Sequence, residues 1–190
     1  MVRAYRPDPV ARETLERIVS VIRRAPSAGF SQGQRVVVVT EPQLREKLVE
    51  TIGGEFYREQ FPNWLDAAPV HIVICTREQD YHDRYQRPDK LVAGTEIEWP
   101  VPYWWFDAGA LEALLHLAAL DEGLAAAVYG VPAERMQRFK DLLDLPDDVA
   151  VACVLTIGHP TQETGPDVSS RGTRPRRPLD ELVRWNRWSS

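Results

Sequence analysis

The sequence contains little cysteine and no long hydrophobic run. Cys75 and Cys153 are the two cysteines among 190 residues, and each lies inside an apolar, strand-like segment. We therefore expect buried free thiols rather than a disulfide or a metal pair. No apolar run reaches the roughly 18 residues that a membrane helix needs, and the charged N-terminus does not resemble a signal peptide. These absences predict a cytoplasmic protein.

The sequence also lacks an excess of basic residues and the usual nucleotide-binding loops. Lys and Arg number 23 against 28 Asp and Glu, for a net charge of −5. Nucleic-acid binding depends largely on clustered cations, so we expect no nucleic-acid partner. No Walker-type loop and no Gly-x-Gly-x-x-Gly motif follows a strand. The four histidines, His71, His82, His116 and His159, show no nucleophile or zinc-ligand spacing, and we predict neither a hydrolytic triad nor a metal site.

The residues that are present are typical of one folded domain spanning residues 1–190. The chain is 44% hydrophobic and 27% charged, and its length suits a single core. Amphipathic spacing predicts helices, and short β-branched runs predict buried strands. We expect helices at 10–24, 42–49, 56–66, 102–121 and 132–143, and strands at 35–40, 70–76, 125–131 and 149–158.

Two segments have unusual composition. Residues 77–99 are polar, carry Tyr81, Tyr85 and Trp99, and show no steady period, so they are either a lid over a flat ligand or a solvated surface loop. Residues 160–190 contain an arginine cluster and end with Trp185 and Trp188. This segment is either an arm that reaches a partner subunit or a tail whose tryptophans pack on the chain's own core.

The helix expected at 102–121 is apolar on nearly every face, which is typical of burial on all sides. In a domain of this size such burial suggests a dimer interface.

Three short segments contain groups suited to a flat, phosphorylated cofactor. Arg3 and the arginines of the C-terminal cluster offer guanidinium groups for a phosphate monoester. The small residues from Pro26 to Gly29 would let a ring approach the backbone, and Gly130 would leave backbone amides free for a ring nitrogen. Each segment also has an ordinary interpretation, as solvated tail, loop or turn.

The order of these segments resembles the nitroreductase family. VRAYRPDPV is similar to that family's Arg-Ser-x-Arg-x-Phe start, with Arg3 on the second arginine, and APSAGFSQ (25–32) to its Ala-Pro-Ser-x-x-Asn-x-Gln loop. Residues 105–132 resemble its Asp-x-Gly helix, Gly-Leu turn and flavin-facing strand. Residues 142–160 and RPRRPLDELV resemble the following strand and the closing arginine motif. The resemblance covers nearly the whole chain except residues 77–99.

This resemblance implies an α+β fold with a mostly antiparallel sheet flanked by helices, in an intertwined homodimer with two FMN sites at its interface. It also implies the site residues. Arg3, Arg174 and Arg176 would bind the phosphate, with Arg177 as an alternative. Pro26, Ser27 and Ala28 would line the ring edge, and Val128, Tyr129 and Gly130 would face the ring, with a backbone amide near N5.

The sequence departs from the family in three places. The family's leading Arg and Ser would fall at or before Met1, Phe30 replaces a frequent Asn, and Gly33-Gln34 replaces a frequent Pro-Trp.

The resemblance implies an enzyme in which the chemistry takes place on the flavin rather than on a catalytic side chain. NAD(P)H would reduce FMN and leave, and a nitroaromatic, quinone or enone would then be reduced in its place, in a ping-pong cycle. Two alternatives stay open. One is an enzyme like the flavin-consuming dimethylbenzimidazole synthases, suggested by the Ser-x-Gly-Phe variant of the loop. The other is a flavin-binding protein without turnover.

Overall fold

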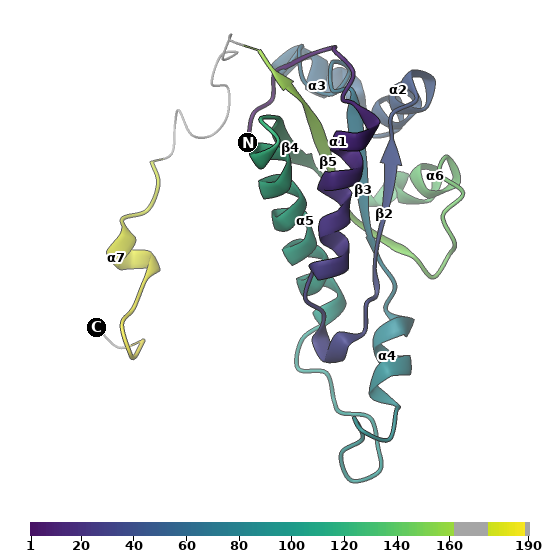
Figure 1. Ribbon diagram of the computed structural model, residues 1–190, viewed down its shortest axis with the longest axis vertical. Helices are drawn as coiled ribbons and strands as arrows, with labels where there is room; N and C mark the ends of the chain where they lie inside the picture. The colour runs from purple at the N-terminus through teal and green to yellow at the C-terminus, as the bar shows by residue number, and fades with distance from the viewer. Residues whose placement is uncertain (162–174, 189–190) are drawn as a thin grey trace.

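The protein is built on a five-stranded sheet in which all the described strand pairs are antiparallel. The computed structural model describes residues 1–161 and 175–188 (Figure 1). Central β3 and β5 pair with each other, β2 pairs with β3, and both β4 and β1 pair with β5. The strands are β1 (Tyr5–Arg6), β2 (Gln34–Val39), β3 (Val70–Thr76), β4 (Ala125–Tyr129) and β5 (Ala150–Pro160). The predicted α+β fold with a mostly antiparallel sheet is confirmed.

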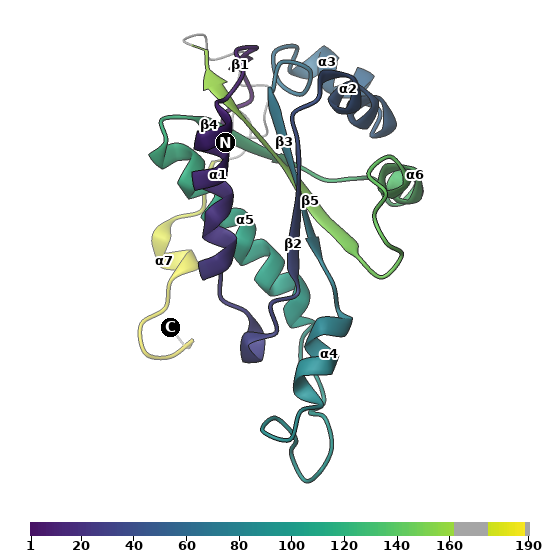
Figure 2. The same cartoon turned by 45° about the vertical axis from the view of Figure 1, so that its right-hand side comes forward.

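Helices cover both faces of the sheet (Figures 1 and 2). Helices α1 and α5 pack on one face, while α2, α3 and α6 cover the other. β3 is buried at every position between these two layers, as its continuous apolar run predicts. The helices are α1 (Arg12–Val19), α2 (Pro42–Thr51), α3 (Gly54–Gln60), α4 (Gln79–Tyr85), α5 (Tyr103–Asp121), α6 (Met136–Asp141) and α7 (Leu179–Leu182).

Several predicted helices are shorter in the structure. The helix expected at 10–24 is α1 followed by a 3-10 turn, and the one expected at 132–143 is a 3-10 turn followed by α6. The helix expected at 56–66 ends at Gln60, because Phe61 has a non-helical conformation (φ −141°). Apolar spacing continues through such turns, so it marks the buried side of a segment better than the end of a helix.

Residues 77–99 contain a helix that the sequence reasoning missed. Helix α4 carries Tyr81 and Tyr85, one helical turn apart, and Tyr81 is fully buried. The other positions of this seven-residue helix are polar, so it shows almost no apolar periodicity. α4 and the loop after it extend beyond the lower end of the sheet (Figure 2).

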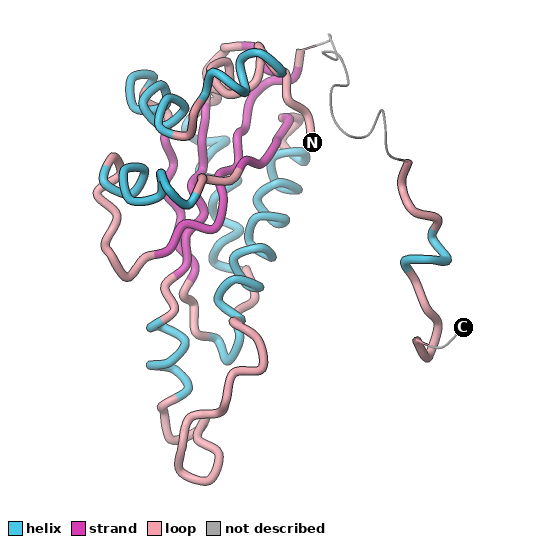
Figure 3. The backbone as a smooth tube through the Cα atoms, turned by 180° about the vertical axis from the view of Figure 1, so that it is seen from behind, coloured by secondary structure: helices cyan, strands magenta, loops and turns pink. Residues whose placement is uncertain are grey.

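The C-terminal segment 175–188 lies apart from the sheet and its helices (Figure 3). Trp185 and Trp188 are 85% and 82% exposed, and Leu179 and Leu182 in α7 are also exposed. Packing of these tryptophans on the chain's own core, the alternative considered from the sequence, is therefore not found.

Both cysteines are free, Cys75 buried and Cys153 half-buried. Burial raises the pKa of the Cys75 thiol to about 11 and that of Cys153 to about 12. No helix in the described ranges is long and apolar enough to cross a membrane.

Candidate functional site

Arg3 is held between two aromatic rings, with no counter-charge among the described residues. Its guanidinium carbon lies 4.9 Å from the ring centre of Phe61 and 4.8 Å from that of Trp64, which is cation–π geometry. Its Nε is buried and has no hydrogen-bond partner, and Arg3 makes no salt bridge within the described residues. A buried donor on a cation is costly to leave unpaired, so this position suits an anion.

The backbone around Arg3 is fixed on both sides. The Val2 amide donates to the Ala126 carbonyl of β4 at 3.0 Å, and the Tyr5 amide donates to the Asn63 carbonyl at 2.9 Å. The Tyr5 hydroxyl lies 2.9 Å from Oγ1 of Thr156. Burial raises the pKa of Tyr5 far above its ordinary value, so the phenol stays neutral. The chain segment that carries Arg3 is therefore tied to β4 and β5.

The loop between α1 and β2 has an unusual backbone. Gly29, Phe30 and Gln32 all have left-handed conformations, with φ of 59°, 60° and 56°. Such conformations are strained for residues other than glycine, and they persist where the surroundings enforce them. The Phe30 side chain is 69% exposed beside this strained backbone.

Buried hydrogen bonds hold this loop in place. The Ala28 amide donates to Oδ2 of Asp107 at 2.9 Å, and the Tyr81 hydroxyl donates to the same oxygen at 2.9 Å. Asp107 is only 4% exposed, and it begins the Asp-x-Gly motif of α5. Burial, followed by the hydrogen bond to Asp107, raises the pKa of Tyr81, so Tyr81 remains a donor. The sequence alone contains this motif but gives no indication of a role for Asp107.

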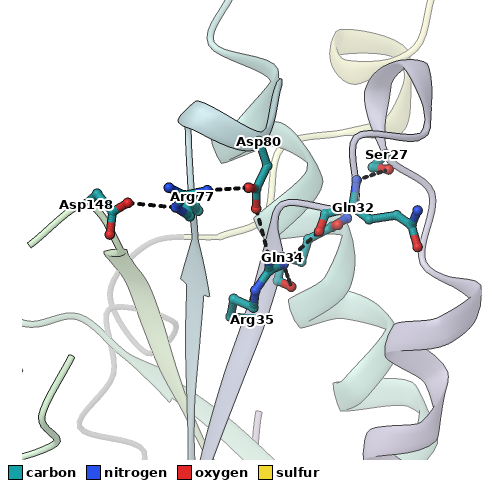
Figure 4. Close-up of polar contacts among 7 residues, drawn as sticks. All are labelled: Ser27, Gln32, Gln34, Arg35, Arg77, Asp80 and Asp148. Atoms are coloured by element: carbon teal, nitrogen blue, oxygen red, sulfur yellow. Dashed lines mark hydrogen bonds and ion pairs between the residues drawn. The ribbon is translucent and has the colours of Figure 1, made fainter. Parts of the chain in front are cut away.

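A polar network joins the loop to β2, α4 and the start of β5 (Figure 4). The Gln32 amide donates to the Ser27 hydroxyl oxygen at 2.9 Å. Arg35 pairs with Asp80 at 2.8 Å, and Arg77 bridges Asp80 and Asp148 at 2.6 and 2.7 Å. Individually such partly exposed ion pairs contribute little, but together they fix α4 against the loop. Pro26, Ser27 and Ala28 thus each take part in a hydrogen bond that holds this turn.

The predicted ring-facing residues Val128, Tyr129 and Gly130 differ in their environment. Val128 is half-buried beside α5, whereas the Tyr129 side chain is buried on the opposite face of the sheet. Gly130 is exposed, and its amide has no backbone partner within the described residues. A Cβ at Gly130 would meet no atom within 4 Å. Tyr129 can therefore face a ligand only through its backbone, next to the open backbone of Gly130.

The Tyr129 side chain is anchored by a buried histidine. Its hydroxyl lies 3.0 Å from Nδ1 of His71, and Nε2 of His71 lies 3.1 Å from the Leu65 carbonyl oxygen. A carbonyl accepts only, so Nε2 carries the proton and Nδ1 accepts from Tyr129. Burial lowers the pKa of His71 to about 4, which keeps the imidazole neutral.

The C-terminal arginines are placed only in part. Arg176 and Arg177 are exposed, and Arg174 lies outside the described residues. Groups of three or more potential metal ligands are absent from the described part of the chain.

Within one chain, Arg3 and the loop that carries Ser27 and Ala28 lie at opposite ends of the sheet. Tyr5, two residues after Arg3, pairs with Pro160 at one end of β5. The loop leads into Gln34, which pairs with Thr76, and Thr76 pairs with Ala150 at the other end. At about 3.3 Å per residue, Arg3 and the loop are roughly 30 Å apart. In Figure 1 the N-terminus accordingly lies beside the upper part of the sheet, and the loop joins the lower ends of α1 and β2.

Solved structures share this architecture. NfrA2 of B. megaterium matches with a TM-score of 0.75 at 22% identity, covering 99% of this chain and 71% of that one. The NADPH:FMN oxidoreductase from Vibrio harveyi, complexed with NAD+, gives a TM-score of 0.71 at 22% identity and covers 100% of this chain and 74% of that one. At these identities the likeness concerns the fold, and it defines the class as α+β proteins of the nitroreductase fold.

The family follows from the sequence comparison. Residues 1–159 match the model of the nitroreductase family, and the chain belongs to that family. The FMN reductase (NAD(P)H) of Bacillus subtilis strain 168 is 29% identical over 170 residues, which are 86% of this chain and 63% of that relative. The chain thus spans less than two thirds of that relative's length. The family resemblance expected from the motifs is confirmed.

Proposed function

We propose that the protein is an FMN-dependent oxidoreductase that uses NAD(P)H to reduce an electron-poor small molecule. The observation that carries this proposal is Arg3, a guanidinium group held between two rings, whose buried Nε has no hydrogen-bond partner within the described residues. Membership of the nitroreductase family supports a flavin as the ligand that supplies the anion.

The residues present fit FMN. Arg3, joined by Arg174 and Arg176, would bind the phosphate, because guanidinium groups donate two parallel hydrogen bonds to its oxygens. Pro26, Ser27 and Ala28 would lie along the ring edge. The open backbone of Gly130 would bring an amide to N5, with Val128 and Tyr129 holding the strand end beside it.

Bound FMN would supply the redox chemistry, taking a hydride from NAD(P)H and passing it to a nitroaromatic, quinone or enone. The protein's part is to bind, to orient and to exclude water. No acid or base is needed at a side chain. Neutral His71 and neutral Tyr129 keep the strand end fixed without placing a charge beside Gly130.

We further propose that two copies form each site. One flavin is much shorter than the roughly 30 Å between Arg3 and the loop, so contact with both requires two chains. The exposed face of α5 is apolar and would pack against its partner. Phe106, Leu117 and Leu120 are 68%, 62% and 48% exposed, and Gly109 and Ala113 lie on the same stripe. The exposed tryptophans of the C-terminal segment would cover the partner subunit.

A visible spectrum of the purified protein tests this function, followed by mixing with NADPH or NADH under nitrogen. We expect flavin bands that bleach on mixing and return when a quinone is added. Colourless protein that takes up no FMN would contradict the proposal. Bound flavin that stays inert would favour a binding protein without turnover. Destruction of the flavin itself would favour the dimethylbenzimidazole synthase-like alternative.

A further inference from the structure

The side chains that hold Arg3 form a cluster that the sequence motifs do not include. Phe61 and Trp64 come from the turn between α3 and β3, about sixty residues away in the sequence. The two rings pack edge to face with centroids 5.5 Å apart. We refer to Phe61 and Trp64 as the aromatic clamp.

Hydrogen bonds to the sheet fix the tryptophan of the clamp. The indole Nε1 of Trp64 donates to Oγ1 of Thr156 at 3.0 Å, and that hydroxyl in turn donates to the Ala127 carbonyl at 2.9 Å. Trp64 is only 2% exposed and also packs edge to face on Tyr129 and Tyr57. The indole ring is therefore held by strands β4 and β5.

From this geometry we infer that the aromatic clamp is a specificity device that holds Arg3 ready for a phosphate monoester. An arginine side chain in water has many conformations, and ordering it on binding lowers affinity. The clamp orders the guanidinium group beforehand. It does so without supplying an acidic partner that would compete with phosphate, because the ring faces are weak, non-ionic partners.

This inference rests on the proposed function, and it adds residues that act through Arg3 rather than on the flavin ring. It predicts a selective effect. Weakening the clamp should reduce the affinity for FMN, which carries the phosphate. The affinity for riboflavin, which has the same ring system without the phosphate, should stay the same.

The test is a pair of titrations, FMN and riboflavin, for the wild-type chain and for Trp64→Leu, Phe61→Leu and Phe56→Leu. Phe56 is the matched control, because it is a 60% exposed phenylalanine on the preceding helix α3 and makes no cation–π contact with Arg3. We expect Trp64→Leu to weaken FMN binding about tenfold, the range of a desolvated cation–π contact, and to leave riboflavin binding unchanged. Phe61→Leu should act in the same direction with a smaller effect, and Phe56→Leu should change neither affinity.

A second comparison distinguishes an effect of the clamp that acts through Arg3 from a general effect on packing. In an Arg3→Ala background, Trp64→Leu should have no further effect on FMN affinity, since the residue through which it acts is gone. Trp64→Phe, which keeps a ring but loses the hydrogen bond to Thr156, covers the case in which the leucine variant does not fold.

The outcomes that overturn the inference are distinct. Equal losses for FMN and riboflavin would make the clamp a packing element alone. Tighter FMN binding in the clamp variants would mean that the rings compete with phosphate for Arg3. Wild-type protein that binds neither flavin would overturn the proposed function and this inference together, whereas FMN binding that ignores Trp64 would overturn the inference alone.

Discussion

At the scale of single residues, burial decides which polar groups stay neutral. His71 and Tyr129 form a hydrogen-bonded pair in the core beneath the end of β4. Arg3 instead lies over two rings in cation–π contact and lacks an acidic partner within the described residues. The pair of His71 and Tyr129 stabilises the fold, whereas Arg3 still has hydrogen-bond donors with which to bind a ligand.

His71 gives the protein a characteristic sensitivity to acid. The unfolded chain protonates this residue near pH 6.5, whereas burial in the folded chain lowers its pKa to about 4. Between these values the unfolded state binds more protons, so stability falls as the pH falls. The shift of about 2.5 pKa units corresponds to roughly 3 kcal/mol.

We predict that His71→Gln removes a pH-dependent loss of about this size in the free energy of unfolding, although the variant is less stable at neutral pH. Urea unfolding of the wild-type and variant chains between about pH 4 and 6.5 measures this difference. His159→Gln, at the end of β5, is the control and should keep the wild-type slope. Parallel slopes for His71→Gln and the wild-type chain would contradict the neutral buried histidine.

At the scale of elements, the loop between α1 and β2 depends on the helix packed against it. Gly33 enters β2 beside α4, where an added Cβ would clash with the Tyr81 ring and lie 2.8 Å from the Arg77 carbonyl oxygen. We predict that Gly33→Ala destabilises the protein by about 1–3 kcal/mol, as overpacking usually does.

Thermal or urea unfolding of the flavin-free protein checks this prediction. Gly130→Ala is the matched control, because Gly130 also adjoins a strand end and no atom lies within 4 Å of the added Cβ. Stability of Gly33→Ala equal to that of the wild-type chain would mean that α4 does not hold the loop.

The elements also show what sequence patterns can and cannot predict. The β-branched run of β3 and the apolar length of α5 predicted those elements nearly to the residue. Helix α4 was missed because its periodicity is carried by two tyrosines alone, and the two-residue strand β1 is too short for any pattern. The roles of Trp64 and Asp107 could not be predicted either, since they arise from contacts between segments far apart in the sequence.

At the scale of the whole molecule, the residues of the candidate site lie in two separate places. Arg3 and the aromatic clamp lie at one end of β5, and the loop with Ser27 and Ala28 lies at the other. The apolar stripe on α5 and the exposed C-terminal tryptophans are surfaces that a second copy would cover. Our central claim is that a complete flavin site takes Arg3 from one chain and the loop from its partner.

Subunit complementation tests this claim most directly. Arg3→Glu should repel the phosphate, and Ala28→Tyr should fill the space along the ring edge, so each homodimer should bind little FMN. In a mixed dimer with one variant of each kind, one site would carry both defects and the other none. We predict that differently tagged, co-purified mixed dimers regain one FMN per dimer. Mixed dimers as empty as the two homodimers would contradict the claim, because every site would then take both residues from a single chain.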